Sequence, residues 1–309
     1  MTPRAGRQRG VALITALVVV ALAAVIATDL MWRSFLDQRR TETVIHGNQA
    51  RQYLRGGEDW AAHILRRDRE ETQSDSLDQM WAQEMPPLPV DGGQVIGRLA
   101  DEQGLFNLNN LITPEGQINE SAVQQFQRLL MLLEIDPESV EAVLDWMDPD
   151  QEPRLRGAED GFYLGLSPAY RTADQAIQTI NELRLIEGFR DPEVFERIEP
   201  YVTALPSSVL TPINVNTAPA PILASLAEDY RVEQAEDLAM LQEDGGFESI
   251  DQFYEAFGRT VDADVDVRSY FFRLTIRADV GTASTTMYSL LFRDESGATV
   301  AVSRSYGAL

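Results

Sequence analysis

The chain of 309 residues contains no cysteine and only two histidines. Without cysteine, disulfide bonds and thiolate metal sites are excluded. Both histidines, His46 and His63, fall in an N-terminal stretch that we expect to be helical. The rest of the chain therefore lacks the base of a Ser-His-Asp triad and the imidazole ligands of a zinc hydrolase. These absences predict a protein that is not an enzyme.

Basic residues are few relative to acidic ones. The sequence holds 26 Lys and Arg against 49 Asp and Glu, which gives a formal net charge of −23. Residues 1–40 contain six Arg and two Asp, so residues 41–309 carry −27. A surface this acidic repels phosphate backbones and attracts divalent cations. We therefore expect no nucleic-acid partner.

Only one apolar stretch is long enough to cross a membrane, VALITALVVVALAAVIAT at 11–28. As a helix its 18 residues rise about 27 Å, close to the roughly 30 Å of a bilayer's hydrocarbon core. Arg4, Arg7 and Arg9 precede it, and the positive-inside rule keeps such a leader in the cytoplasm. Everything after the span is then predicted to lie across the membrane.

Three interpretations of this N-terminus remain open. A secretory signal would end at a small-x-small cleavage site, for which Ala21-Leu22-Ala23 is a candidate. A plain signal anchor would not be processed. In a prepilin-like leader a peptidase cuts after a glycine that follows basic residues and directly precedes the apolar stretch. Gly10 followed by Val11 fits this third pattern best.

The remaining sequence predicts an α+β protein. No proline occurs from 31 to 70, and the apolar spacing there predicts an amphipathic continuation of the helix, with a bend or weak point at Gly56-Gly57. A linker is predicted at 85–93, where a Pro-rich segment is followed by Asp91-Gly92-Gly93. One alternating strand is expected at 94–100, and a mainly helical region follows from 107 to 257. Three alternating segments then occupy 271–280, 285–294 and 299–306. We expect one small antiparallel sheet split by a helical insertion.

The helical region contains an internal repeat. LFNLNNL at 105–111 and PINVNTA at 212–218 share an apolar-Asn-apolar-Asn core that precedes an amphipathic helix. Two Asn side chains spaced by two can turn inward, bond loop backbone and cap the next helix. Such units resemble helix-hairpin-helix modules, which elsewhere bind DNA phosphates. The basic loops needed for that role are missing here, so we interpret the units as scaffold.

The segment with the strongest chemical signal is the loop DWMDPDQEPRLRGAEDGFY at 145–163. Nine carboxylates fall between 136 and 160, against Arg154 and Arg156. Carboxylates this dense repel one another unless a cation lies among them, and a flexible loop of oxygen ligands suits Ca²⁺ better than Mg²⁺. The alternative is a solvated acidic turn in which the two arginines pair locally.

Several motifs in fixed order resemble one family, the minor pseudopilin GspK of bacterial type II secretion. They are the leader and span at 1–28, GRLADEQGLFNLNNL (97–111), DWMDPDQEPRLRGAEDGFY (145–163), INELRLIEGF (180–189) and INVNTAP (213–219). The resemblance implies a pilin-like fold, in which a long N-terminal helix packs on a small antiparallel sheet, with a large inserted α-helical domain. The expected divisions are a leader (1–10), a transmembrane helix start (11–30), its periplasmic continuation (31–70), a linker with the first strand (71–104), the insertion (105–258) and the last strands (259–309).

The resemblance also implies a function. The chain would be cleaved between Gly10 and Val11 and methylated by the prepilin peptidase, and would span the inner membrane once with its head in the periplasm. It would stand at the tip of the pseudopilus beside the other minor pseudopilins, above the major pseudopilin, where it helps to initiate assembly. From there it would act on secreted substrates at the outer-membrane secretin.

Two sets of residues take roles from this resemblance. After cleavage the fifth residue is Thr15, where the major pseudopilins have a Glu thought to pair with a neighbour's N-terminus. A subunit without that charge suits the topmost position. The calcium ligands of the family map onto Asp148, Asp150, Glu159 and Asp160, and also onto Asp145. The competing interpretation is a membrane-anchored, calcium-binding interaction protein that never enters a filament.

Overall fold

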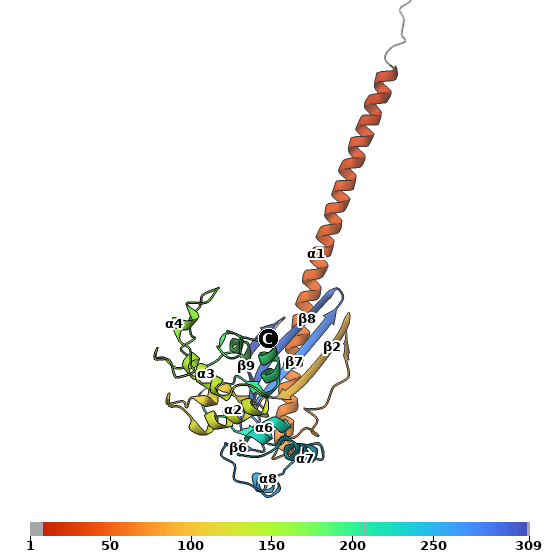
Figure 1. Cartoon of the computed structure of the whole chain (residues 1–309). Coiled ribbons are helices and arrows are strands. Elements are labelled where there is room, and N and C mark those ends of the chain that lie inside the picture. The colour runs from red at the N-terminus through yellow and green to blue at the C-terminus, as the bar shows by residue number, and fades with distance from the viewer. Residues whose placement is uncertain (1–8, 207, 308–309) are drawn as a thin grey trace, which may run out of the picture.

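The computed structural model of this chain describes residues 9–206 and 208–307, so positions 1–8 of the expected leader lie outside the described residues. One helix, α1 (Arg9–Glu71), extends far beyond the rest of the molecule (Figure 1). Its 63 residues correspond to about 95 Å. Residues 11–41 are exposed along its whole circumference, and the apolar part of this stretch is long enough to cross a membrane.

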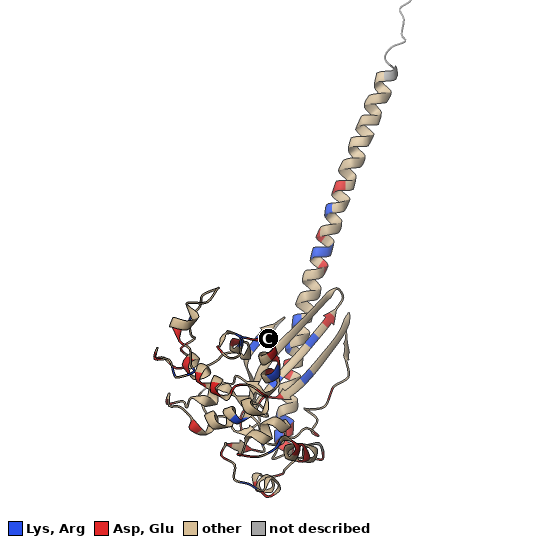
Figure 2. Ribbon diagram, in the orientation of Figure 1, with Lys and Arg blue, Asp and Glu red and all other residues tan. Residues whose placement is uncertain are grey.

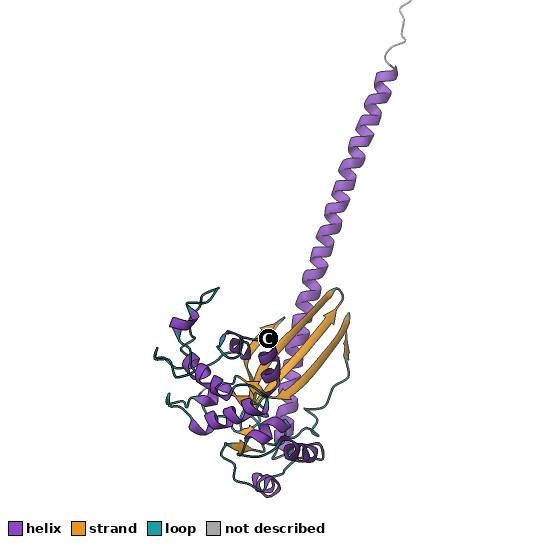
Figure 3. Cartoon of the chain, viewed as in Figure 1, coloured by secondary structure: helices purple, strands orange, loops and turns teal. Residues whose placement is uncertain are grey.

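The C-terminal third of α1 packs on a five-stranded antiparallel sheet of order β1-β2-β7-β8-β9 (Figure 3). The strands are β1 (Leu88–Val90), β2 (Gly93–Asp101), β7 (Phe271–Val280), β8 (Ala283–Arg293) and β9 (Thr299–Tyr306). The helix buries Ala50, Leu54, Ala61 and Leu65 against alternate residues of the sheet. This helix on an antiparallel sheet, with helices inserted between β2 and β7, confirms the expected pilin-like fold.

The sequence predicted one strand before the insertion, and the structure corrects this to two. The Pro-rich segment predicted as a linker contains β1, which pairs with β2 across a turn at Asp91-Gly92. Pro89 is tolerated because β1 lies at the edge of the sheet, where a missing N–H costs little.

The predicted bend at Gly56-Gly57 is also wrong, because α1 runs through both glycines. A Cβ on Gly57 would lie 2.0 Å from Cδ1 of Ile276 in β7, whereas one on Gly56 would meet nothing within 4 Å. Gly57 therefore allows helix and sheet to approach closely. One helical turn is further tied by Glu58, which accepts from Ser289 (2.6 Å) and pairs with Arg304 (2.7 Å).

The inserted region has its own hydrophobic core and consists of two units. Its helices are the α-helices α2 (Glu120–Leu132), α3 (Val140–Met147), α4 (Asp160–Tyr163), α5 (Pro192–Ile198), α6 (Ala220–Ser225), α7 (Val232–Glu243) and α8 (Ile250–Phe257), with the 3-10 helices η1 (Leu108–Leu111), η2 (Pro137–Ser139), η3 (Ile180–Leu185) and η4 (Glu199–Tyr201). Each unit opens on a short strand that pairs in parallel with a later one: β3 (Phe106–Asn107) with β4 (Val202–Thr203), and β5 (Ile213–Asn214) with β6 (Val265–Asp266).

The two Asn pairs form the same contacts in both units. The first Asn accepts from the backbone N–H two residues on, at 3.1 Å for Asn107 and 3.0 Å for Asn214. The second Asn is buried and accepts from one distant N–H, that of Ile177 for Asn109 and that of Phe247 for Asn216. The side chains do turn inward as predicted, and they hold distant loops to the start of each unit. They do not cap the following α-helices as expected, because the N-terminal cap is Asn119 for α2 and Pro219 for α6.

Most of the net charge lies in this insertion. Residues 105–258 contain 29 Asp and Glu against eight Arg, and acidic residues are spread over its helices and loops (Figure 2). Acidic residues thus greatly outnumber basic ones in both units, a balance that disfavours binding of a phosphate backbone.

The approach at Gly57 yields a paired test. Relative to Gly56→Ala, Gly57→Ala should lower the free energy of unfolding by about 1–3 kcal/mol, because its methyl group displaces Cδ1 of Ile276 in the packed core. Gly56→Ala is the matched control and should stabilise by about 1 kcal/mol, since its site is open and alanine favours the helix. Urea unfolding of the full chain in detergent measures both, and equal effects of the two substitutions would contradict the close approach.

Candidate metal centre

The acidic loop is held between two helix ends. Asp148 is the C-terminal cap of α3 and Glu159 is the N-terminal cap of α4, so the ten residues between them must turn back on themselves. Pro149 and Pro153 prevent the helix from continuing. The fold therefore brings the two ends of the acidic run together.

Aromatic side chains pack between α3 and α4 and hold the two ends of the loop in place. Tyr163 of α4 is buried, with its ring 5.4 Å from that of Trp146 on α3 and stacked 5.3 Å from that of Tyr170. Its hydroxyl accepts from the N–H of Glu187 at 3.1 Å. The loop backbone approaches the buried side chain of Asp145 closely at Gly157, where a Cβ would lie 1.8 Å from Oδ2 of Asp145.

Asp148, Asp150 and Glu159 form a cluster that could hold a cation. Each offers one carboxylate oxygen, and these oxygens all lie within 4.8 Å of one another. Oxygen ligands at 2.3–2.6 Å from one Ca²⁺ are at most about 5 Å apart, so the spacing is compatible with a single hard cation.

The cluster lacks protein partners for its buried oxygens. Glu159 is only 4 % exposed, yet neither of its carboxylate oxygens has a hydrogen bond, and Oδ1 of Asp148 also has none. Burial, and then the negative charges of Asp145, Asp148, Asp150 and Asp174, raise the pKa of Glu159 to about 7. Buried polar atoms are normally satisfied, so a bound cation would supply the missing partner.

Local arginines neutralise part of the site. Arg154 pairs with Asp145, which is fully buried, and its Nη1 lies 2.5 Å from Oδ2 of Asp148. Arg156 turns outward to Glu138 at 2.8 Å. The alternative of an acidic turn neutralised by arginine therefore describes Asp145 and Asp148. It leaves Asp150 and Glu159 without a cationic partner among the described residues.

The structure brings together three of the five expected ligands. Asp160 is engaged elsewhere, because its carboxylate binds Nη1 of Arg171 at 2.9 Å and the N–H of Thr172 at 3.1 Å. Asp145 is engaged by Arg154, although burial raises its pKa overall.

Sequence reasoning missed Asp174. Its charge acts on Glu159, its backbone has a positive φ of 51°, and its N–H donates to the carbonyl of Trp146 at 3.1 Å. Its carboxylate accepts from the hydroxyl of Thr172 at 2.6 Å. Asp174 lies fourteen residues beyond the acidic run, and no spacing pattern connects it to the loop.

The residues expected at the filament end of the chain lie in α1. Gly10 and Val11 belong to its first turn. The hydroxyl of Thr15 lies 3.1 Å from the carbonyl oxygen of Val11 and 3.0 Å from that of Ala12, and donates within the helix. Thr15 thus satisfies its polar group locally and adds no charge.

An exposed N-terminal helix segment that is long and apolar enough to cross a membrane, a sheet packed on the C-terminal third of the same helix and an inserted pair of helical units define the class: a pilin-like protein. Family models described as "Type II secretion system (T2SS), protein K" match residues 104–207 and 213–263, which correspond to the two helical units.

Full-length relatives agree. Type II secretion system protein K of Pseudomonas aeruginosa is 35 % identical over 97 % of this chain and 93 % of its own length. That of Pectobacterium carotovorum subsp. carotovorum is 32 % identical over 97 % of both chains. A chain from the crystal structure of the GspK-GspI-GspJ complex of the enterotoxigenic Escherichia coli type 2 secretion system superposes with a TM-score of 0.74. It has 27 % identity and covers 87 % of this chain and 100 % of that chain.

This chain belongs to the type II secretion system protein K family. It is a minor pseudopilin of that system, as its sequence motifs predicted.

Proposed function

We propose that this minor pseudopilin is anchored in the bacterial inner membrane, extends its head into the periplasm and stands at the tip of the pseudopilus. The role is structural: it helps to initiate the filament, which exports folded proteins through the outer-membrane secretin. The observation that carries the proposal is the likeness, over 87 % of this chain, to a component of a complex with GspI and GspJ. We infer that this chain assembles with its own counterparts of those two proteins.

The shape of the molecule supports a terminal position. The apolar residues of α1 between 11 and 28 are uncovered, as a helix surrounded by lipid or by neighbouring subunits requires. α7 and α8 lie at the end of the head farthest from the start of α1 (Figure 1). A further subunit stacked above this one would meet the insertion.

Thr15 supports the same position through charge. A glutamate there would need a cationic partner in apolar surroundings, as a buried charge is costly unless paired. The hydroxyl of Thr15 is satisfied by its own helix and needs no subunit beyond. We infer that this end of α1 is compatible with the first position in the filament.

Leader removal is the first test. In cells with an active prepilin peptidase, the membrane-extracted protein should begin at methylated Val11, and without the peptidase it should retain Met1. Intact mass and N-terminal sequencing measure this. Because all 26 basic residues are Arg, the α-amino group is the only amine in the chain. Reductive methylation should therefore add one group to a methylated terminus and two to an unmethylated one.

Matched glycine variants separate processing from expression. Gly10→Val should block cleavage, and Gly6→Val, in the same leader, should not. A chain cut beyond Ala23 in both variants would show that the N-terminus is a secretory signal. That result would contradict the proposed prepilin-like processing and the membrane anchoring.

The charge argument predicts that Thr15→Glu impairs secretion. The added carboxylate is costly within the apolar span unless a cationic partner neutralises it. Secretion of a reporter exoprotein should fall at unchanged protein level, while Thr15→Ser should act as wild type. Normal secretion by Thr15→Glu would remove Thr15 from the argument for the tip.

We also propose that the cluster of Asp148, Asp150 and Glu159 binds Ca²⁺. Three clustered carboxylates on a Pro-containing loop, two of which have buried oxygens without a hydrogen bond, match a hard and geometrically tolerant cation. Bound Ca²⁺ would be a partner for the carboxylate oxygens of Glu159 and Asp148 that have no hydrogen bond, and would thereby stabilise the first helical unit.

Calcium binding should release protons, because the ligand oxygens must be ionised. With a pKa of about 7 for Glu159, about half a proton should leave per ion at pH 7, and affinity should rise as pH rises through that value. Calorimetric titration of the full chain in two buffers of different ionisation enthalpy measures both.

Two Glu→Gln variants test the assignment. Glu159→Gln should lose at least about tenfold in affinity together with the proton release. Glu152→Gln, on the exposed part of the same loop, should change neither. Undiminished binding by Glu159→Gln would place the ion elsewhere.

A further inference from the structure

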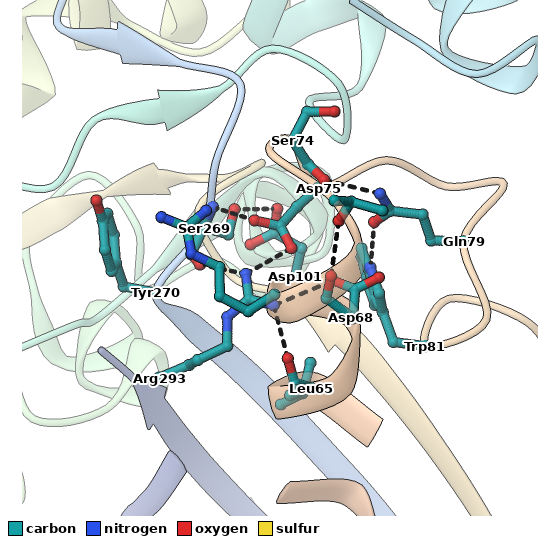
Figure 4. Close-up of polar contacts among 12 residues, drawn as sticks. Leu65, Asp68, Ser74, Asp75, Gln79, Trp81, Asp101, Ser269, Tyr270 and Arg293 are labelled. Carbon is teal, nitrogen blue, oxygen red and sulfur yellow. Dashed lines mark hydrogen bonds and ion pairs between the residues drawn. The ribbon is translucent and has the colours of Figure 1, made fainter. Parts of the chain in front are cut away.

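A buried arginine lies where the helical insertion meets the helix-sheet part, that is, α1 with the five-stranded sheet. Arg293 ends β8 and is 1 % exposed (Figure 4). Its Nη1 binds Oδ2 of Asp68 on α1 and the carbonyl of Leu65, each at 3.1 Å. Its Nη2 binds Oδ1 of Asp75 at 2.5 Å and the carbonyl of Ser269 at 2.8 Å. One guanidinium thus joins the end of α1, the segment after it, and the entry to β7.

A third carboxylate extends this cluster into the second helical unit. Asp101, at the end of β2, accepts from the hydroxyls of Ser269 and Thr217, each at 2.6 Å, and from Nδ2 of Asn214 at 2.9 Å. Ser269 also donates its N–H to Asp75 at 2.8 Å. Asn214 and Thr217 belong to the repeated motif, so the insertion is attached to the sheet through Asp101.

The charges of the cluster do not balance. Asp68 and Asp75 share a single cation, Arg293, and Asp101 is joined to them through Ser269 with no ion pair of its own among the described residues. On the neighbouring β6 segment, Arg268 pairs with Asp266 at 3.4 Å and is not directed at the cluster. The two histidines lie elsewhere on α1. His46 contacts Thr282 in the β7–β8 turn, and His63 contacts Arg66.

An excess of buried negative charge is costly in a low-dielectric interior, and a bound proton removes part of it. Burial, and then the neighbouring Asp75, raise the pKa of Asp68 to about 7. Burial raises the pKa of Asp101 to about 6. Because the unfolded values are lower, this stabilisation is complete below pH 4 and is lost as pH rises through 6 to 7.

We propose that the cluster of Arg293, Asp68, Asp75 and Asp101 is a proton-dependent joint, which holds the helical insertion to the helix-sheet part when protonated and loosens when fully ionised. The joint would tighten the head in an acidic periplasm and leave it more mobile in an alkaline one.

Hydrogen exchange of the full chain in detergent tests the joint. All proteins carry Glu159→Gln, which removes the group of the acidic loop whose pKa is about 7. Protection of the amides at 72–76 and 264–270, corrected for intrinsic exchange, should fall about tenfold between pH 6 and pH 8, as expected for one group with a pKa of about 7. Asp68→Asn should remove most of this pH dependence.

The matched control is Glu102→Gln. Glu102 is also buried and lies beside Asp101, but Arg273 pairs with it one to one at 2.7 Å. This variant should keep the wild-type pH dependence. If Asp68→Asn keeps it too, the proposal is overturned.

A second measurement does not need Asp68→Asn to fold. The infrared carbonyl band of a protonated carboxylic acid should be present in the Glu159→Gln protein at pH 6 and absent at pH 8.5. Absence of the band at pH 6 would overturn the proposal independently.

Discussion

The rest of the head depends on the pairing of Arg293 inside the molecule. A guanidinium that is 1 % exposed must find acceptors, and the acceptors come from α1, from the segment after α1 and from the entry to β7. These requirements place the end of the long helix, the start of β7 and the end of β8 at one point. The five-stranded sheet and the insertion are positioned from there, since Ser269 passes the network on to Asp101 and Asn214.

The insertion leaves the pilin-like part intact because it enters and leaves at neighbouring strands. β2 ends at Asp101 and β7 begins at Phe271, and the two pair antiparallel with Asp101 opposite Phe272. The end of β2 and the start of β7 therefore lie side by side, and roughly 170 residues are inserted between them without separating the two strands. Surface connections tolerate long insertions because the entropy of loop closure grows slowly with length. The duplicated Asn motif organises both units by satisfying loop backbone that would otherwise be buried without partners.

The acidic loop shows how far composition predicts a site. A dense run of carboxylates correctly indicated where like charges would gather, and three of its members do meet. Composition does not decide which carboxylate takes an arginine. Asp145 and Asp160 are claimed by Arg154 and Arg171, whereas Glu159 keeps two unpartnered oxygens. The charge of Asp174 acts on Glu159 because its loop folds back onto α3, and no local sequence pattern indicates this.

By itself, the sequence determined the membrane-grade segment, the helical continuation, the alternating strands and the repeat, because each depends on periodicity or composition over neighbouring residues. It misjudged Gly57 and the Pro-rich strand β1, whose roles depend on Ile276 and on pairing with β2. The tertiary structure alone decided the charge clusters. Asp68 and Arg293 are 225 residues apart, and Glu58 and Arg304 are 246 apart. Such pairs follow from which surfaces the packed core brings together, and that is a property of the whole fold.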